Sequence, residues 1–227
     1  LVLLFLDIPR PSAHEAHDTG RPLRELAAQG KFVVAVLGAA VGYGVMSLVM
    51  TATPLAMHAH AHPFRDTAFV IEWHVLGMFA PSFVTGHLIR RFGVLNIMLT
   101  GALLSVLCVV VNLGGTELTH FWGALLLLGV GWNFLFVGGT TLLTETYQIE
   151  EKAKAQALND FLVFTLVTIS SLSAGALHYL VGWRAVNLGV LAPMALILGA
   201  LLWLRSKQRV DSAATVAAPA PESTKPE

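Results

Sequence analysis

Six apolar segments dominate this sequence, and each is long enough to cross a lipid bilayer. They cover residues 32–57, 67–89, 94–114, 121–144, 156–181 and 184–204, whereas one crossing needs roughly 20 residues. Of the 227 residues in the chain, 55% are hydrophobic and only 12% are charged. Because lipid offers no partner for an unpaired backbone amide, each segment must be helical. The sequence therefore predicts an all-α membrane protein with six transmembrane helices in residues 32–205.

Polar sequence flanks this domain on both sides. Residues 1–31 open on the apolar stretch LVLLFLD without a methionine and continue with Pro and Gly breaks, so we expect the end of a preceding helix followed by a cytoplasmic connector. This opening predicts that the chain is the C-terminal part of a longer protein. Residues 206–227 are rich in Ala, Pro, Ser and charge and lack apolar periodicity, which is typical of a disordered cytoplasmic tail.

Basic residues fall mainly on one side of the predicted membrane. If the connector is cytoplasmic, twelve Lys and Arg residues lie on the inner side, and only Arg65 and Arg184 lie outside. Cytoplasmic loops of membrane proteins carry this excess of positive charge. The sequence therefore predicts a multi-pass protein of the inner (plasma) membrane with both termini in the cytoplasm. The formal net charge of zero gives no sign of a nucleic-acid partner.

The sequence matches itself at one ungapped offset of 89 residues. This offset maps the first three segments onto the last three, and segments three and six are nearly free of polar residues. A repeat of three crossings must insert its second copy upside down, since three is an odd number. The pattern indicates a 3+3 inverted repeat, as in secondary transporters. The matched pairs are Gly42 with Gly131, Tyr43 with Trp132, Thr51 with Thr140, Ser82 with Ser171, Gly86 with Gly175, Leu88 with Leu177 and Gly93 with Gly182.

The turn between the second and third segments resembles a motif of the major facilitator superfamily of secondary transporters. Its sequence GHLIRRFG, residues 86–93, is similar to the family's cytoplasmic loop motif, roughly G-x-x-x-D-R-x-G, with Arg90 where Asp is usual. Glu145 and Lys152 resemble the family's Glu-x6-Arg element, and residues 175–183 resemble the junction of its eleventh and twelfth helices. The resemblance implies the second half of a twelve-helix fold, with the missing N-terminal six-helix half of the same protein as its partner.

The same loop motif predicts a gate on the cytoplasmic side. Glycines let the two helices and their turn pack closely, while arginines pair with acids of a neighbouring helix in one conformation only. Glu145 is the nearest expected partner of these arginines, and the resemblance implies that Asp160 faces the missing half. The alternative is that the arginines only satisfy the positive-charge bias of inner loops. The predicted gating residues are Gly86, Arg90, Arg91, Gly93, Glu145, Lys152 and Asp160.

Two titratable residues, Glu72 and His74, lie inside the second segment and are candidates for proton coupling. A charge at membrane depth costs about 3 kcal/mol even on lenient insertion scales, so such residues usually face other helices or a wet cavity. Positions two apart on a helix point to nearly opposite sides, so we expect one of the two to pack against a neighbour. The alternative for Glu72 is contact with headgroups or water near the outer surface. In the same segment, a kink at Pro81 would suit a helix that rocks.

Polar and aromatic residues of segments one, four and five predict a binding site for a small organic solute. Ring stacking would supply contact area, and the Asn133 amide would orient the solute. The alternative for the hydroxyl residues is a structural role between helices, which we expect for Ser47, Thr165 and Ser171. The predicted substrate-binding residues are Tyr43, Thr51, Trp132, Asn133, Phe136 and Thr168.

These features predict a secondary active transporter in the lipid bilayer that moves a small-molecule substrate by alternating access, coupled to protons. The sequence has no G-x-x-x-x-G-K-[ST] nucleotide-binding loop, and an enzyme is not expected, because no nucleophile and base lie at catalytic spacing. The alternative is a six-helix haem or metal-binding protein, with His74 and His178, or the loop histidines His58, His60 and His62, as ligands. The transporter hypothesis needs no cofactor and no bound metal.

Overall fold

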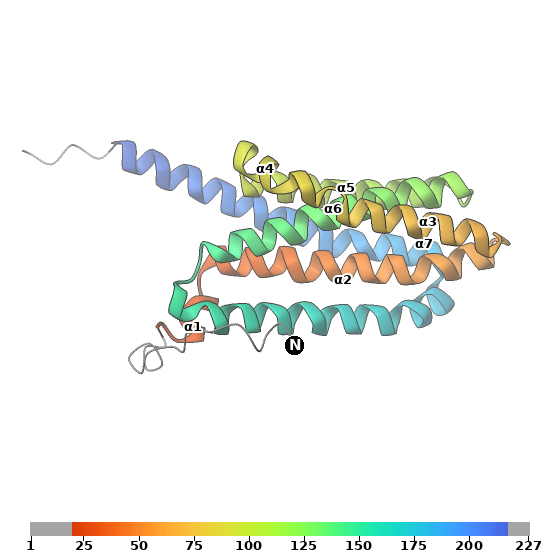
Figure 1. Ribbon diagram of the computed structural model, residues 1–227, viewed down its shortest axis with the longest axis horizontal. Coiled ribbons are helices and arrows are strands. Elements are labelled where there is room, and N and C mark those ends of the chain that lie inside the picture. The colour runs from red at the N-terminus through yellow and green to blue at the C-terminus, as the bar shows by residue number, and fades with distance from the viewer. Residues whose placement is uncertain (1–19, 218–227) are drawn as a thin grey trace, which may run out of the picture.

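The computed structural model describes residues 20–217, and every regular element in this range is a helix (Figure 1). The all-α class predicted from the sequence is therefore confirmed. The predicted end of a preceding helix falls in residues 1–19, outside the described residues. The elements are α1 (Leu23–Ala27), α2 (Gly30–Ala59), α3 (Phe64–Phe79), α4 (Ser82–Phe92), α5 (Val94–Gly114), α6 (Leu118–Thr144), the short 3-10 helix η2 (Ile149–Glu151) and α7 (Lys152–Ala217).

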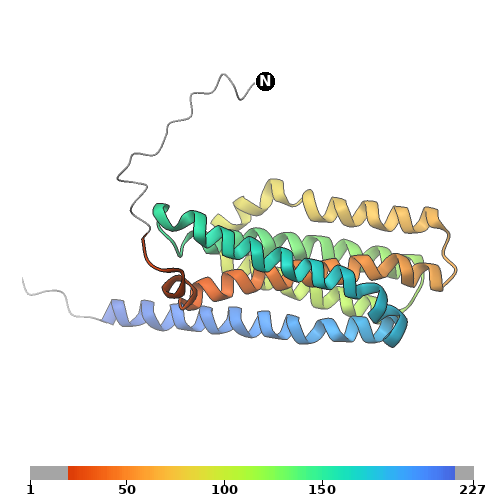
Figure 2. The ribbon, with the colours of Figure 1, turned by 90° about the horizontal axis from the view of Figure 1, so that it is seen from below.

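Helix α7 consists of two arms that meet at Gly182. This residue has φ 80° and ψ 168°, a backbone conformation that residues with a side chain rarely adopt. The arms before and after Gly182, teal and blue in Figures 1 and 2, run in opposite directions along the bundle. The second arm is helical to Ala217, so the disordered tail predicted from residue 206 is wrong for residues 206–217. Ala, Arg, Lys and Gln in this stretch favour a helix even without apolar periodicity.

Four helices, α2, α5, α6 and α7, are long and apolar enough to cross a membrane. Helices α3 and α4 add a fifth span if the pair, which is bent by 43°, counts as one. The bend lies at Pro81, whose ring nitrogen has no hydrogen to continue the helix, so the kink predicted there is confirmed. The first four predicted segments thus correspond to α2, to α3 with α4, to α5 and to α6.

Helix α6 packs mainly against α2, α3 and α5, and glycines bring its backbone directly onto theirs. A Cβ on Gly129 would lie 2.6 Å from the His74 carbonyl oxygen of α3. A Cβ on Gly131 would lie 2.8 Å from the Gly101 oxygen of α5, and one on Gly139 would lie 2.8 Å from a backbone oxygen of α2. Small residues allow this close approach, which holds helices together in a membrane.

The charged connections gather at one end of the bundle. Helix α1, the turn between α4 and α5, the loop between α6 and α7 and the end of the second arm of α7 all lie there (Figure 1). Along the sides, large apolar side chains such as Phe83 and Leu172 are exposed, which suits surroundings of lipid or protein rather than water. The arrangement is that of a helical bundle whose long axis crosses a membrane.

We expect Gly129→Ala to destabilise the bundle by about 1–3 kcal/mol, because the new methyl group is forced against the α3 backbone. A Cβ on Gly123 of the same helix would meet nothing within 4 Å, so Gly123→Ala is the matched control and should keep or raise stability. Thermal unfolding in detergent measures both. Equal melting midpoints for the two variants would contradict the close packing at Gly129.

Candidate functional site

Four aromatic rings meet where α2, α3 and α6 pack together. Trp132 and Phe136, one turn apart on α6, stack with 5.2 Å between ring centroids and an angle of 9°. Tyr43 of α2 meets both rings edge-on, at 5.0 Å from Trp132 and 5.4 Å from Phe136. Phe79 of α3 lies 6.0 Å from Trp132. The structure therefore brings Tyr43, Trp132 and Phe136 of the predicted substrate-binding set into one aromatic cluster.

The aromatic cluster combines flat apolar surface with an unused hydrogen-bond donor. Trp132 is buried, and among the described residues its indole Nε1 has no hydrogen-bond partner. A buried indole N–H usually finds a partner, so this donor is unused within the described part of the chain. Phe79, by contrast, is 57% exposed and opens the cluster to one side. Such a site can hold a planar ring by stacking and orient it through one N–H group.

Asn133 follows Trp132 in the sequence, but its amide binds the break between α3 and α4. Its Nδ2 donates to the Met78 carbonyl oxygen over 2.7 Å and to the Ser82 hydroxyl over 2.6 Å. The Thr85 hydroxyl lies 2.7 Å from the Asn133 Oδ1, and Asn133 is buried. Because both amide protons are used inside the protein, the geometry favours a structural role over the predicted role of orienting a solute.

The two threonines of the predicted substrate-binding set lie outside the aromatic cluster. Thr51 is half-buried on α2, about two turns beyond Tyr43. Thr168 is exposed on the first arm of α7, where its hydroxyl donates to the Phe164 carbonyl oxygen over 2.7 Å. Thr168 and Asp160 line a shallow hollow of about 460 Å³ on this helix. The structure therefore groups Thr168 with Asp160, a predicted gating residue, rather than with the rings.

Glu72 and His74 of α3 have different environments. His74 is fully buried, and its Nδ1 donates to the Leu125 carbonyl oxygen of α6 over 2.7 Å. Its Nε2 is also buried and has no hydrogen-bond partner in the described part of the chain. Glu72 is exposed. The prediction that one of the two packs against a neighbour is confirmed, and Glu72 is the one that remains accessible.

The loop motif forms the turn between α4 and α5. Gly93 ends α4 with φ 85°, in the region that favours glycine, whereas a Cβ on Gly86 would meet nothing within 4 Å. Arg90 and Arg91 lie on the last turn of α4, and both are exposed. Glycine is thus required at Gly93 by the backbone, while Gly86 lies in open space.

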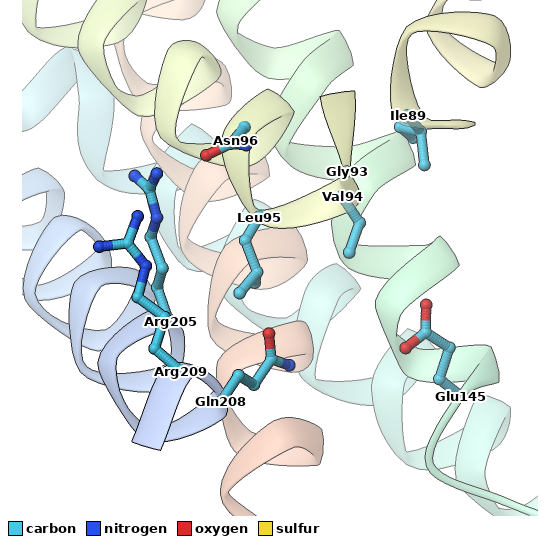
Figure 3. A pocket seen from close by; sticks show the side chains of 9 residues that line it. All are labelled: Ile89, Gly93, Val94, Leu95, Asn96, Glu145, Arg205, Gln208 and Arg209. Carbon is cyan, nitrogen blue, oxygen red and sulfur yellow. The ribbon is translucent and has the colours of Figure 1, made fainter. Parts of the chain in front are cut away.

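A hollow of about 690 Å³ lies beside this turn and separates charges of opposite sign. Figure 3 shows Glu145 on one side of it and Arg205 and Arg209, from the second arm of α7, on the other. The Glu145 carboxylate lies 2.6 Å from the Lys31 Nζ. In this conformation Glu145 therefore pairs with Lys31, and its pairing with the arginines of the loop motif stays a prediction. Helices α2 and α6 pack side by side, which brings Lys31 at the start of one to Glu145 at the end of the other.

A second ion pair joins the N-terminal connector to the loop between α6 and α7. The Arg21 guanidinium donates to the Glu151 carboxylate through Nε and Nη2, each over 2.8 Å, and the Arg21 backbone N–H adds a third bond of 2.8 Å. The Glu151 side chain is fully buried. The hydrogen bonds from Arg21, together with one from the Gln148 backbone, lower the pKa of Glu151 from 4.5 to about 2. The connector is therefore held by a carboxylate that stays ionised at neutral pH.

Sequence reasoning missed this ion pair, although a local signal exists. Gln148 and Glu151 have the spacing of a capping box, and the structure forms that box at η2. The partner Arg21 is 130 residues away, and no local pattern reveals it. A buried amide pair was missed for the same reason: Asn112 of α5 donates to the Asn187 Oδ1 of α7 over 2.8 Å.

Two histidines of the predicted outer loop bond to backbone carbonyl oxygens in the part of the chain that the structure describes. His60 donates through Nδ1 to the Ala56 carbonyl oxygen, and His62 donates through Nε2 to the Thr116 carbonyl oxygen, each over 2.8 Å. Within residues 20–217, no group of three or more His, Cys, Asp or Glu side chains is arranged to hold a metal ion. The haem or metal-binding alternative therefore gains no support.

Long apolar helices, a charged end and an aromatic cluster between helices define a multi-pass helical membrane protein. Comparison with protein families is more specific: the family model of the Major Facilitator Superfamily matches residues 32–226. The chain belongs to this superfamily. The resemblance noted from the loop motif is thereby confirmed, and membership in a family of transporters agrees with the expectation that the chain is not an enzyme.

Three relatives illustrate the similarity. The riboflavin transporter RfnT of Brucella anthropi is 43% identical over 210 residues, which cover 92% of this chain and 52% of that protein. Two uncharacterized transporters of the same type from Bacillus subtilis, YdeG and YddS, are 30% identical over 171 residues and 34% identical over 139 residues. These matches cover 72% and 60% of this chain, but only 38% and 31% of the relatives. The chain thus spans about half the length of RfnT and a smaller share of the other two.

We expect Glu151→Gln to lower stability at neutral pH and to flatten its loss in acid. A carboxyl group whose pKa is lower in the folded state stabilises the fold fully at pH values above its ordinary pKa, here 4.5. This stabilisation is lost as the pH falls through the folded-state pKa of about 2. Thermal unfolding between pH 7 and about pH 2 measures the slope. Glu150→Gln removes an exposed neighbouring carboxylate and is the control. Parallel pH profiles for wild type and Glu151→Gln would rule out a stabilising role for this ion pair.

Proposed function

We propose that this chain is the six-crossing half of a secondary transporter that moves a small planar heteroaromatic solute, such as riboflavin, by alternating access. The observation that carries the proposal is the aromatic cluster of Tyr43, Trp132 and Phe136 between α2 and α6. The name of the relative RfnT supports a flavin as the solute. A flavin ring system is flat and aromatic, and aromatic side chains favour such rings by stacking or edge-to-face contact.

In this proposal the crossings form a 3+3 inverted repeat, with the two arms of α7 as separate crossings. Ser82 and Ser171 match at the 89-residue offset, and each bonds to the first helix of the opposite triplet. Ser82 accepts a hydrogen bond from Asn133 of α6, and the Ser171 and Ser47 hydroxyls, on α7 and α2, lie 2.6 Å apart. Matched serines that each contact the first helix of the opposite triplet are what a two-fold relation between the triplets would produce, although their partners Asn133 and Ser47 do not match each other at this offset.

The predicted residues have different roles in this proposal. Tyr43, Trp132 and Phe136 bind the solute, and Thr51 lines the path beyond them on α2. Thr168 and Asp160 share an exposed hollow on α7, and we assign this face to contact with the other half of the protein. Gating involves the turn at residues 86–93 together with the ion pair of Lys31 and Glu145. This ion pair must break if α2 and α6 move apart at the end of the bundle where it lies.

Protons drive transport in this proposal, and Glu72 carries them. It is exposed on α3, whereas the neighbouring His74 is bonded to α6. The end of the bundle that holds the connector, the loop motif and the arginines of α7 faces the cytoplasm, because positive charge is retained on that side. Both chain termini then lie in the cytoplasm, and the membrane is the bacterial plasma membrane.

Replacing Trp132 by Ala should raise the KM for riboflavin at least about tenfold, because a stacking partner and its buried area are lost. Uptake of radiolabelled riboflavin by cells that express the protein at its full natural length measures this. Trp122→Ala is the matched control, since Trp122 also has a buried indole N–H but packs against Trp73 instead. An unchanged KM in Trp132→Ala, or an equal loss in the control, would contradict the proposed site.

Glu72→Gln should abolish the dependence of uptake on a pH gradient while leaving binding of the solute intact. The amide has nearly the same shape as the carboxyl group but cannot take up a proton. Uptake is compared with and without an imposed gradient, and Glu117→Gln removes another exposed carboxylate as a control. Coupling that persists in Glu72→Gln would refute the role of this residue.

A further inference from the structure

The break between α3 and α4 removes backbone hydrogen bonds that a continuous helix would form. Helix α3 ends at Phe79, α4 begins at Ser82, and the two are bent by 43°. In an unbroken helix the Met78 carbonyl oxygen would accept from the amide four residues later. Instead it accepts from the Asn133 Nδ2 of α6 over 2.7 Å. Asn133 thus supplies the hydrogen bond that the break removes.

On one side of the break, α3 is fixed to α6 at three successive turns. His74 donates to the Leu125 carbonyl oxygen over 2.7 Å. One turn further along α6, a Cβ on Gly129 would lie 2.6 Å from the His74 carbonyl oxygen and 2.9 Å from the Met78 amide nitrogen. One more turn brings Asn133 to Met78. A hydrogen bond, a backbone contact and a second hydrogen bond therefore join the same two helices.

On the other side of the break, α4 is held loosely. Phe83 is 93% exposed and Val84 is 52% exposed, and a Cβ on Gly86 would meet nothing within 4 Å. Thr85 is the one buried residue of α4, and its hydroxyl is the group that faces the Asn133 Oδ1 over 2.7 Å. The tie between α4 and α6 is therefore concentrated at Asn133, through Ser82 and Thr85.

The Thr85 hydroxyl has two acceptors and only one proton to donate. It lies 2.7 Å from the Asn133 Oδ1 and 2.8 Å from the Pro81 carbonyl oxygen of its own helix. Threonine commonly donates to the carbonyl four residues earlier in a helix. When α4 moves away from α6, the hydroxyl can turn to Pro81, so it keeps a hydrogen bond in both positions.

We propose that Asn133 is the pivot of a hinge at Pro81, about which α4 swings while α3 stays fixed to α6. Rotation about this pivot moves Arg90 and Arg91 and the adjoining turn relative to Glu145. The role of this hinge rests on the proposed function, because a transporter needs a moving segment to open one end. Its geometry does not depend on which solute is carried. Asn133 is then a positioning residue, distinct from the rings that bind the solute.

Distances between spin labels test the hinge without any substrate. One pair joins His87→Cys on α4 to Leu103→Cys on α5, and a second joins Val75→Cys on α3 to Leu103→Cys; all three positions are exposed. Cys108→Ala, which replaces the buried native cysteine, removes the background label. In Asn133→Leu, made in the full-length protein, we expect the distance distribution between positions 87 and 103 to shift and widen, whereas the distribution between 75 and 103 stays the same.

Two further variants keep the experiment decisive. Thr85→Val preserves the shape of the side chain but removes the hydroxyl, so it should shift the 87–103 distribution in the same direction even if Asn133→Leu folds poorly. Asn112→Leu removes another buried interhelical amide away from the break and should change neither distribution. An unchanged 87–103 distribution in Thr85→Val, or an equal change in both label pairs, would overturn the hinge. A failure of riboflavin uptake in the wild type would refute the proposed solute and leave this result intact.

Discussion

Close packing of the α6 backbone against α2, α3 and α5 is the contact on which the rest of the structure depends. Inside a bilayer, burial of apolar side chains adds little to helix association, because lipid is equally apolar, so close approach and polar contacts have to hold the bundle together. Gly129, Gly131 and Gly139 provide that approach on three sides of one helix. The aromatic cluster, the break in α3 and α4 and the ion pair of Glu145 are all positioned by this helix.

In the proposed hinge, the same helix holds α3 fixed and anchors the segment α4 that moves. Trp132 and Asn133 are neighbours in the chain, yet Trp132 meets Tyr43 and Phe79, while Asn133 holds the break at Met78. The proposed solute site and the proposed pivot therefore lie on one turn of α6. In this proposal, a solute that contacts Trp132 binds next to Asn133, the residue that anchors α4. Binding and movement of α4 would then be coupled through adjacent residues.

Local patterns in the sequence predicted the elements and some of their contacts well. Apolar length predicted the helices, Pro81 predicted the bend, and the spacing of Glu72 and His74 predicted that they would differ in burial. The aromatic residues Tyr43 and Trp132 of the first and fourth segments are in contact in the structure. These features depend on helix geometry and on the chemistry of single residues, so a stretch of one helix contains the information. The 3+3 repeat and the solute-binding roles remain proposals.

Tertiary structure decided which polar groups meet, and the sequence could not. Composition and helix period determined that this chain forms apolar helices with a positive end, because each helix satisfies its own backbone and needs only a sufficient length of apolar residues. The partners of Glu145, Glu151 and Asn133 come from 114, 130 and 55 residues away. Which residues pair depends on how closely the glycines let neighbouring helices approach and on which turns of the two helices lie side by side. Both are determined only when all the helices pack together.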